Sequence, residues 1–250
     1  MRHFISIGIL ILLTSSTNAQ LADADAFFKG TYDKAFIRKH KIKQVLVDIF
    51  INGKKSTFYI FQFDRKGLLK KQTILDSLQK NVNDYIFKYN KHGDQIERTN
   101  IAYELNKTYK VTFLKTYNDS QLVSDKSSDL LFMTEYSYNS KGQIKETSTI
   151  LGWDSLNNSK RISIYNYDTK GKLQAIKDLI VNFNGSTNVV ETTTFTYDTN
   201  GKIVSVFRDN APAYYINYNS NFLIKSKRIK MPEDLGSLEI IDNYSYSFWK

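Results

Sequence analysis

The segment Phe195–Val206 reads FTYDTNGKIVSV, and four similar phrases occur elsewhere in the chain. They are FQFDRKGLLKKQ at 61–72, FKYNKHGDQIER at 87–98, YSYNSKGQIKET at 136–147 and YNYDTKGKLQAI at 165–176. Every phrase has Asp or Asn three residues before a glycine, which is typical of a type I turn because the Asx side chain accepts hydrogen bonds from the next backbone N–H groups. The glycine then supplies a positive φ, as the glycine bulge of a common hairpin closure requires. Each phrase is therefore predicted to be a hairpin tip, with its structural turn at Gly67, Gly93, Gly142, Gly171 or Gly201.

The residues around each tip alternate as β-strands do. Before the tip, aromatic or Thr side chains recur at every second position, as at Tyr85, Phe87 and Tyr89. This period of two is typical of a half-buried strand. Two weaker copies, at 117–120 and 218–222, extend the series. The pairs Asn52-Gly53 and Asn184-Gly185 predict plain two-residue turns between other strands.

The tip glycines follow one another at similar intervals, for example 29 residues from Gly142 to Gly171 and 30 from there to Gly201. Such a period indicates an array of hairpins, in which each unit buries its aromatic face against its neighbours. We predict an all-β fold: an antiparallel meander of repeated β-hairpins that forms a curved or spiralling sheet, with a short N-terminal helix. The pattern leaves open whether the sheet closes. The expected segments are a signal peptide at 1–19, an N-terminal capping segment with the first strands at 20–57, and the repeat sheet at 58–250.

The pattern Tyr/Phe–Asp/Asn–x–x–Gly–x–Ile/Leu resembles the YD repeat of Rhs-type proteins, and the resemblance covers about residues 58–229. In that family the repeats form a long β-sheet that spirals into a shell around a cargo. This chain is shorter, has fewer copies and shows no toxin-like C-terminal extension. The resemblance therefore implies a short curved sheet in place of a closed cargo shell.

The N-terminus has the three parts of a secretory signal peptide. Arg2 and His3 precede an apolar run, Phe4–Leu13, and small polar residues end in Thr17-Asn18-Ala19. The apolar run is too short for a membrane helix, which needs about 20 residues. We expect export to the periplasm or cell surface of a Gram-negative bacterium, with no transmembrane helix after cleavage. Apolar residues spaced three or four apart between 24 and 36 predict a short helix that covers one end of the sheet.

The chain carries 35 Lys and Arg against 25 Asp and Glu, which gives a net charge of +10. Lys predominates, whereas Arg is the residue favoured for bidentate recognition of phosphates and bases. Composition and export therefore argue against nucleic acid as a partner. An envelope protein or an anionic glycan is a partner that a basic exported protein could meet. The alternative is that the lysines only keep exposed strand faces soluble.

Few side chains are present that could support catalysis. The chain has no Cys and three His, and only His40 and His92 follow the signal segment, whereas a zinc site draws on several clustered His or Cys side chains. Nucleophile and phosphate-loop motifs are missing. The carboxylates are explained by turns or by cross-strand pairing with Lys, and no pair stands out as a glycosidase site. We therefore expect no enzyme activity, no catalytic or metal-binding residues and no cofactor.

Aromatic residues are abundant, with 17 Tyr and 16 Phe. Most would form the buried face of the sheet, but exposed rings can also stack against sugars or hold a protein partner. Trp153, in the segment ILGWDSLNN between two strands, is the foremost candidate for ligand or partner contact, together with Tyr136 and Tyr165. Two Asp-Ser-Leu tripeptides, at 76–78 and 154–156, resemble acceptors for O-linked glycans and fall in predicted loops.

Three classes of function remain. The favoured class is a non-enzymatic binding or scaffold module of the bacterial cell envelope. An outer-membrane β-barrel is an alternative, suggested by the alternating strands and by the aromatic C-terminus YSYSFWK at 244–250. Charges on both faces of several strands depart from the continuous apolar band of such barrels. A glycan-acting envelope enzyme is the third class.

Overall fold

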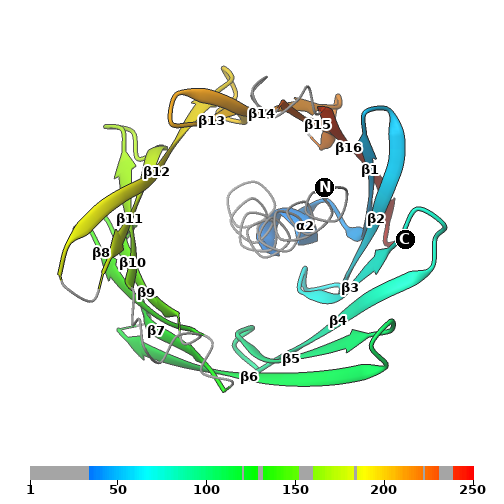
Figure 1. Cartoon of the computed structure of the whole chain (residues 1–250), viewed down its shortest axis with the longest axis horizontal. Coiled ribbons are helices and arrows are strands. Elements are labelled where there is room, and N and C mark those ends of the chain that lie inside the picture. Colours follow the sequence, from blue (N-terminus) through cyan, green and yellow to red (C-terminus); the bar gives the residue numbers. More distant parts are fainter. Residues whose placement is uncertain are drawn as a thin grey trace, which may run out of the picture.

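The computed structural model describes residues 34–119, 121–128, 132–151, 160–182, 185–221, 223–230 and 239–250. These residues form a closed β-barrel of sixteen antiparallel strands with a short helix, α2 (Lys34–Lys39), inside the ring (Figure 1). The first eight strands are β1 (Ile42–Ile51), β2 (Lys54–Phe63), β3 (Leu69–Leu75), β4 (Asn81–Tyr89), β5 (Gln95–Ala102), β6 (Lys107–Asn118), β7 (Gln121–Ser127) and β8 (Phe132–Tyr138). The others are β9 (Ile144–Leu151), β10 (Lys160–Tyr167), β11 (Leu173–Val181), β12 (Thr187–Tyr197), β13 (Ile203–Arg208), β14 (Ala211–Tyr218), β15 (Ile224–Lys230) and β16 (Glu239–Phe248).

The order of the strands around the barrel follows their order along the chain, and the first strand pairs with the last. β1 is joined to β16 from Ile42 to Ile51, and beyond the strands the Trp249 N–H donates to the Lys41 carbonyl at 2.7 Å. The expectation of a curved or spiralling sheet is therefore wrong, because this pairing leaves the sheet no free edge. Closure pairs the backbone groups that the two edge strands of an open sheet would expose.

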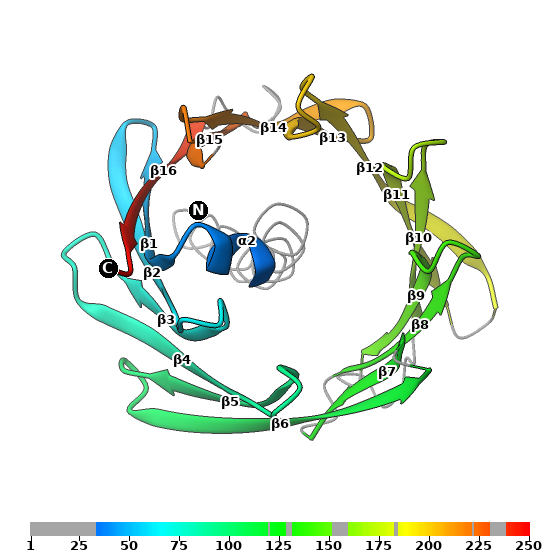
Figure 2. The ribbon, with the colours of Figure 1, turned by 180° about the vertical axis from the view of Figure 1, so that it is seen from behind.

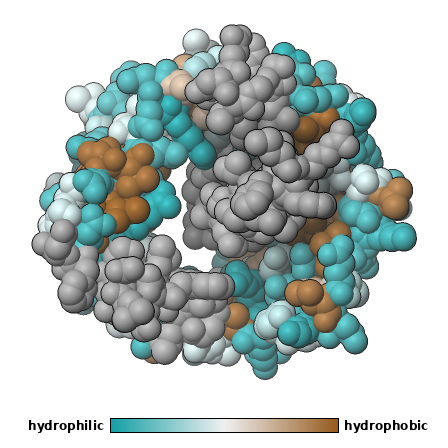
Figure 3. Space-filling model, viewed as in Figure 1, coloured by the Kyte–Doolittle hydropathy of each residue, from teal (hydrophilic) through white to brown (hydrophobic). Residues whose placement is uncertain are grey.

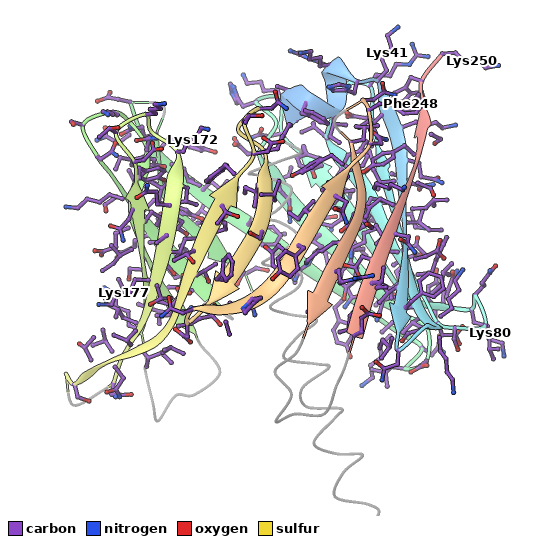
Figure 4. The ribbon with its side chains drawn as sticks, turned by 90° about the horizontal axis from the view of Figure 1, so that it is seen from above. Lys41, Lys80, Lys172, Lys177, Phe248 and Lys250 are labelled. Atoms are coloured by element: carbon purple, nitrogen blue, oxygen red, sulfur yellow. The ribbon has the colours of Figure 1, made fainter. Side chains whose placement is uncertain are left out.

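Every second connection is a tip of the repeated phrase, and all of these tips lie at one end of the barrel, which we call the tip rim. It comprises the turns after β2, β4, β6, β8, β10, β12 and β14, together with α2 and the end of β16. The remaining connections form the opposite end, the far rim. Figure 4 shows Lys41, Lys172 and Phe248 at the tip rim and Lys80 at the far rim.

The tip after β2 shows how the phrase builds a turn. The Gly67 N–H donates to the Asp64 carbonyl at 3.0 Å. The Asp64 Oδ1 atom accepts from the N–H groups of Lys66 (2.8 Å) and Leu68 (2.9 Å). All five phrase glycines have φ between 74° and 89°. Local side-chain chemistry therefore sets the shape of each tip.

The turn at Gly185 differs from the plain two-residue turn predicted for it. The Gly185 N–H donates to the Asn182 carbonyl, and the Asn182 N–H donates to the Ser186 carbonyl, both at 2.9 Å. This is the same backbone bonding as in the tips, although the turn lies at the far rim. Asn184 itself lies outside the described residues.

The phrase tyrosines link neighbouring hairpins, whereas the first phrase has Phe63 at this position. The Tyr197 hydroxyl donates to the carbonyl of Leu173 at 2.5 Å, and Leu173 is the aliphatic residue of the preceding phrase. Tyr117 instead donates to the Asp94 carboxylate. The Tyr197 bond recurs from Tyr89 to Leu69 (2.7 Å) and, at 2.8 Å each, from Tyr138 to Leu122, Tyr167 to Ile144, Tyr218 to Ile203 and Tyr246 to Ile224. The phrase thus supplies both a turn and a side-chain bond to the turn before it.

Helix α2 lies within the ring of strands at the tip rim (Figure 2). Its Ile37 side chain is 1% exposed and belongs to a buried cluster with side chains from β1, β2, β13, β14 and β15. A Cβ atom on Gly67 would overlap the Lys34 carbonyl oxygen, so the first tip fits directly against the helix. Of the helix expected near residues 24–36, only the part from Lys34 onward lies in the described residues. Helix α2 lies beside the place where β16 pairs with β1, which we call the seam.

Candidate functional site

The inward face of each strand follows from its packing with α2. Ile37 shares a buried cluster with Val45 and Phe61, so these side chains point into the barrel while their chain neighbours point outward. Residues directly opposite each other on paired strands share a face. Because Phe61 lies opposite Gln72, which lies opposite Tyr85, the register carries this assignment around the wall.

The inner wall has two unlike halves. The apolar half surrounds α2, and its buried residues are Val45, Val47, Phe61, Phe63, Val206, Tyr214, Ile216, Leu223 and Ile224. The polar half runs from β5 to β12, and its inward residues include Arg98, Asn100, Asp125, Thr134, Thr147, Arg161, Ser163, Asp178, Glu191 and Thr193. In the space-filling view the lumen is hollowed beside the strands of this half (Figure 3). The polar half is therefore the part of the wall that a solute in the lumen would contact.

The guanidinium group of Arg98 lies between two aromatic rings on the neighbouring strands. Its Cζ atom is 5.8 Å from the centre of the Tyr85 ring on β4 and 5.9 Å from that of Phe113 on β6. These contacts hold the guanidinium in place. Its Nε atom is nevertheless buried without a hydrogen-bond partner, and so is the side-chain oxygen of Asn100 on the same strand. Buried polar atoms are normally bonded to protein, water or ligand, so these two atoms have hydrogen-bonding capacity that the described side chains leave unused.

Ion pairs continue the polar half away from Arg98. Lys115 Nζ lies 3.4 Å from Asp125 Oδ2, and Arg161 Nη2 lies 2.9 Å from Asp178 Oδ2. Further round the wall, Arg208 Nε is 3.7 Å from Glu191 Oε1. The second oxygen of Asp125 is buried without a hydrogen-bond partner. These three cations are therefore each paired with a carboxylate, and the free Asp125 oxygen can still accept a hydrogen bond.

A carboxylate with an altered pKa lies beside the apolar half. Asp242 on β16 is 8% exposed, its Oδ1 atom has no hydrogen-bond partner, and Lys227 is its register partner on β15. Burial raises the pKa of Asp242 to about 6, although the charge of Lys227 acts in the opposite direction. Burial also raises the pKa of Tyr59 to about 12, and the charge of Asp242 adds to this shift. The protonation of Asp242 therefore changes near pH 6.

The outward face of the barrel carries many charges. Lys71 pairs with Asp84 at 2.9 Å, and Glu97 pairs with both Lys88 (2.8 Å) and Lys110 (2.7 Å). Further outward charges along the strands are Asp48, Lys126, Glu135, Glu146, Lys177, Arg228 and Glu239. Figure 3 shows a largely hydrophilic margin with hydrophobic residues in separate patches. Over the described residues, this wall departs from the continuous apolar band of a lipid-facing barrel.

The structure describes some of the residues singled out from the sequence and not others. Tyr136 on β8 and Tyr165 on β10 are half-buried and face the lumen, opposite Thr147 and Ile176. Trp153 and the tripeptide at 154–156 lie outside the described residues, whereas 76–78 lies in the far-rim turn after β3. In the part of the chain that the structure describes, no three potential metal ligands come together.

The sequence reasoning missed Arg98 and Asn100. They lie in the segment QIERTNIA, which has no aromatic or turn residue to attract attention. Their spacing of two places them on the same face of a strand, and this is the one signal that could have grouped them. Which face that is, and which rings flank it, depends on strands that are distant in the sequence.

No known protein family matches this chain, and no curated protein matches it. Among solved structures, a porin-like protein from Bacteroides uniformis ATCC 8492 is similar with a TM-score of 0.52 at 10% identity, over 82% of this chain and 98% of that one. The fold is that of a porin-like barrel. A porin-like protein from Bacteroides vulgatus ATCC 8482 is similar with a TM-score of 0.41 at 14% identity, over 82% of this chain and 98% of that one. The Photorhabdus luminescens Tc holotoxin pore is similar with a TM-score of 0.30 at 10% identity, over 70% of this chain and 12% of that one.

At this identity, the Bacteroides uniformis structure informs the fold alone. The closed barrel agrees better with the outer-membrane barrel that the sequence offered as an alternative than with an open repeat sheet. The relation to YD-repeat proteins stays a prediction, because the similarity to the toxin is too weak to carry it. No helix in the described residues is long and apolar enough to cross a membrane.

Proposed function

We propose that this protein is an exported barrel of the Gram-negative cell envelope that binds a neutral oligosaccharide in the polar half of its lumen. One observation carries the proposal: Arg98 and Asn100 offer buried, unpartnered polar atoms on the inner wall, beside the rings of Tyr85 and Phe113. Leaving a buried polar group without a partner costs about 1–3 kcal/mol. A ligand that satisfies these atoms recovers that free energy.

The chemistry of the wall suits a sugar. A sugar ring presents hydroxyl groups, which bond to amides, carboxylates and guanidinium groups, and C–H faces, which pack on aromatic rings. The inward Tyr136 and Tyr165 supply rings, and the Thr and Ser side chains between them supply hydroxyl groups. The wall cations of Lys115 and Arg161 are already paired with carboxylates. Among the described residues of this half, only the guanidinium of Arg98, which lies against two rings, offers an unpaired charge. A neutral ligand therefore fits better than one that carries several charges.

The outward face favours water over lipid as the medium around the barrel. A Lys or Arg on a lipid-facing wall costs about 2–4 kcal/mol at the bilayer midplane. Lys88 and Lys110 pair across the outer wall with Glu97, and their side chains are 61% and 59% exposed. We expect the chain from residue 20 onward to purify without detergent as a folded barrel.

The decisive experiment compares two neighbouring substitutions on β5 that lie on opposite faces of the wall. Neutral oligosaccharides from bacterial envelopes are screened on an array, and the affinity of those that bind is measured by calorimetry. Asn100→Ala, on the inner face, should weaken binding about 10-fold to 100-fold, since the ligand loses a buried hydrogen-bond partner. Thr99→Ala, on the outer face, should leave the affinity unchanged. Equal affinities for the two variants, or no binder among the oligosaccharides, would refute the proposal.

An outer-membrane pore is the second candidate, and the closed sixteen-stranded barrel of porin-like fold favours it. A pore would need detergent for purification and would give stepwise conductance in a planar lipid bilayer. Conductance that is reduced by a bulky substitution in the lumen, such as Thr147→Trp, would support the pore over the binding barrel. A detergent-free monomer without conductance would support the binding barrel.

A further inference from the structure

The two rims of the barrel differ in charge. The tip rim carries sixteen Lys and Arg side chains and only five acidic side chains, Asp64, Asp94, Asp119, Asp168 and Asp198, all of them in turns. We call these cations the basic rim: Lys34, Arg38, Lys39, Lys41, Lys43, Arg65, Lys66, Lys70, Lys91, Lys141, Lys145, Lys170, Lys172, Lys202, Lys225 and Lys250. The described part of the far rim has a smaller excess, with Lys54, Lys55, Lys80, Lys107, Lys160, Arg208 and Lys230 set against Asp76, Glu104, Asp209 and Glu239. Most of the excess positive charge of the described residues is therefore at the tip rim.

Among the described residues, the ion pairs lie on the walls of the barrel, and none includes a member of the basic rim. Burial lowers the pKa of His40, and the nearby charges of Lys39 and Lys202 lower it further. These cations are consequently available to an external anion.

Aromatic side chains accompany the basic rim at the end of the chain. Phe248 is 49% exposed. The half-buried ring of Trp249 lies 5.5 Å from Lys43 Nζ and 5.2 Å from Arg65 Cζ, and its indole N–H is buried without a hydrogen-bond partner. Trp and other aromatic residues beside Lys are typical of protein segments at a membrane–water interface.

We propose that the basic rim docks the barrel end-on, as a peripheral protein, onto an anionic lipid surface. The turns that carry these cations lie around one end of the closed barrel, and Figure 4 shows Lys41, Lys172 and Lys250 at that end. Such an arrangement matches a plane better than a single polymer thread. Fourteen of the sixteen are Lys, and three of the cations are on α2 beside the first tip. The attraction is therefore mainly that of point charges, each Lys near an anionic leaflet contributing about 1 kcal/mol. Phe248 and Trp249 then enter the headgroup region.

The test measures partitioning of the full mature chain onto vesicles by co-sedimentation. Vesicles rich in phosphatidylglycerol should bind the protein, and vesicles of phosphatidylcholine alone should not. Raising the salt concentration should release the protein, because charges at an exposed surface are screened. The exposed tip residues Lys66, Lys141 and Lys170 are each replaced by Glu. This triple variant should bind the vesicles at least about 100-fold more weakly than the unmodified protein. The matched control replaces Lys54, Lys80 and Lys107 at the far rim by Glu and should bind like the unmodified protein.

The orientation has its own readout, because the chain has only two Trp residues. In a Trp153→Phe background, Trp249 fluorescence should shift to shorter wavelength on binding and should be quenched by brominated lipid. Equal losses in the two triple variants, an unshifted Trp249, or binding to a soluble anionic polysaccharide without binding to vesicles would each overturn the proposal. Sugar binding in the lumen is measured without vesicles, so either proposal can fail alone.

Discussion

Replacing Gly67 by Ala tests whether α2 is held by the first tip. Gly67 has φ of 82°, and a Cβ atom there would overlap the Lys34 carbonyl oxygen and lie 3.2 Å from the Arg38 nitrogen. Gly53 at the far rim has a similar φ of 74°, but a Cβ atom there would meet nothing within 4 Å. The pair therefore separates the backbone effect from the packing effect.

The expected magnitudes follow from these two environments. An L-residue in the left-handed region costs about 1–2 kcal/mol, so Gly53→Ala should lower the free energy of unfolding by that amount. Gly67→Ala carries the same cost and also forces the backbone of α2 away from the tip, which adds about 1–3 kcal/mol in a well-packed region. We expect a total loss of about 2–5 kcal/mol for Gly67→Ala.

Urea denaturation followed by circular dichroism gives both free energies, and limited proteolysis reports whether α2 has become accessible. Gly67→Ala should be cleaved near Arg38 or Lys39 before the barrel unfolds, whereas Gly53→Ala should not. If the two variants lose equal stability and resist cleavage equally, the contact with the first tip does not hold α2 in place, and this prediction is wrong.

Three further results are expected. The pKa of Asp242 is raised from 3.8 to about 6 in the folded state, so the folded protein holds the proton more tightly than the unfolded chain. This contribution to the free energy of unfolding, up to about 3 kcal/mol, is lost as pH rises from about 4 to 6. The Asp242→Asn variant should not show this loss when its unfolding free energy is measured over the same pH range. Tyr197→Phe deletes the hydrogen bond to the Leu173 carbonyl and should lower the free energy of unfolding by about 1 kcal/mol. The control Tyr215→Phe changes an outward ring that is 39% exposed and should lower it by nothing measurable. Burial opposes ionisation of Asp84, but hydrogen bonds from Thr73, Tyr103 and Lys71 outweigh it and lower the pKa of Asp84. The stability that this network provides should be present at neutral pH and lost as pH falls below the pKa of the unfolded chain, near 4. If Asp84→Leu loses unfolding free energy with falling pH as steeply as the unmodified protein does in chemical denaturation, this expectation is contradicted.

Parts of the site were accessible from sequence and parts were not. Tyr136 and Tyr165 are aromatic residues of a repeated phrase, so their strand and their face follow from the alternation around a local turn. Arg98 and Asn100 become a site only because Tyr85 and Phe113, from the strands on either side, enclose the guanidinium group. Cross-strand neighbours depend on register, which a single strand does not encode. The aromatic face was expected to be the buried core of the sheet, yet much of it lines a lumen.

The repeated phrase by itself determined the hairpins, because each turn depends on an Asx side chain and a glycine that lie within five residues of each other. The alternation of the strands likewise determined which side chains share a face. Tertiary structure alone decided that the last strand meets the first and that α2 lies inside the ring. These outcomes depend on the number of strands and on the twist and stagger accumulated between all of them, which are properties of the whole sheet and of no single segment.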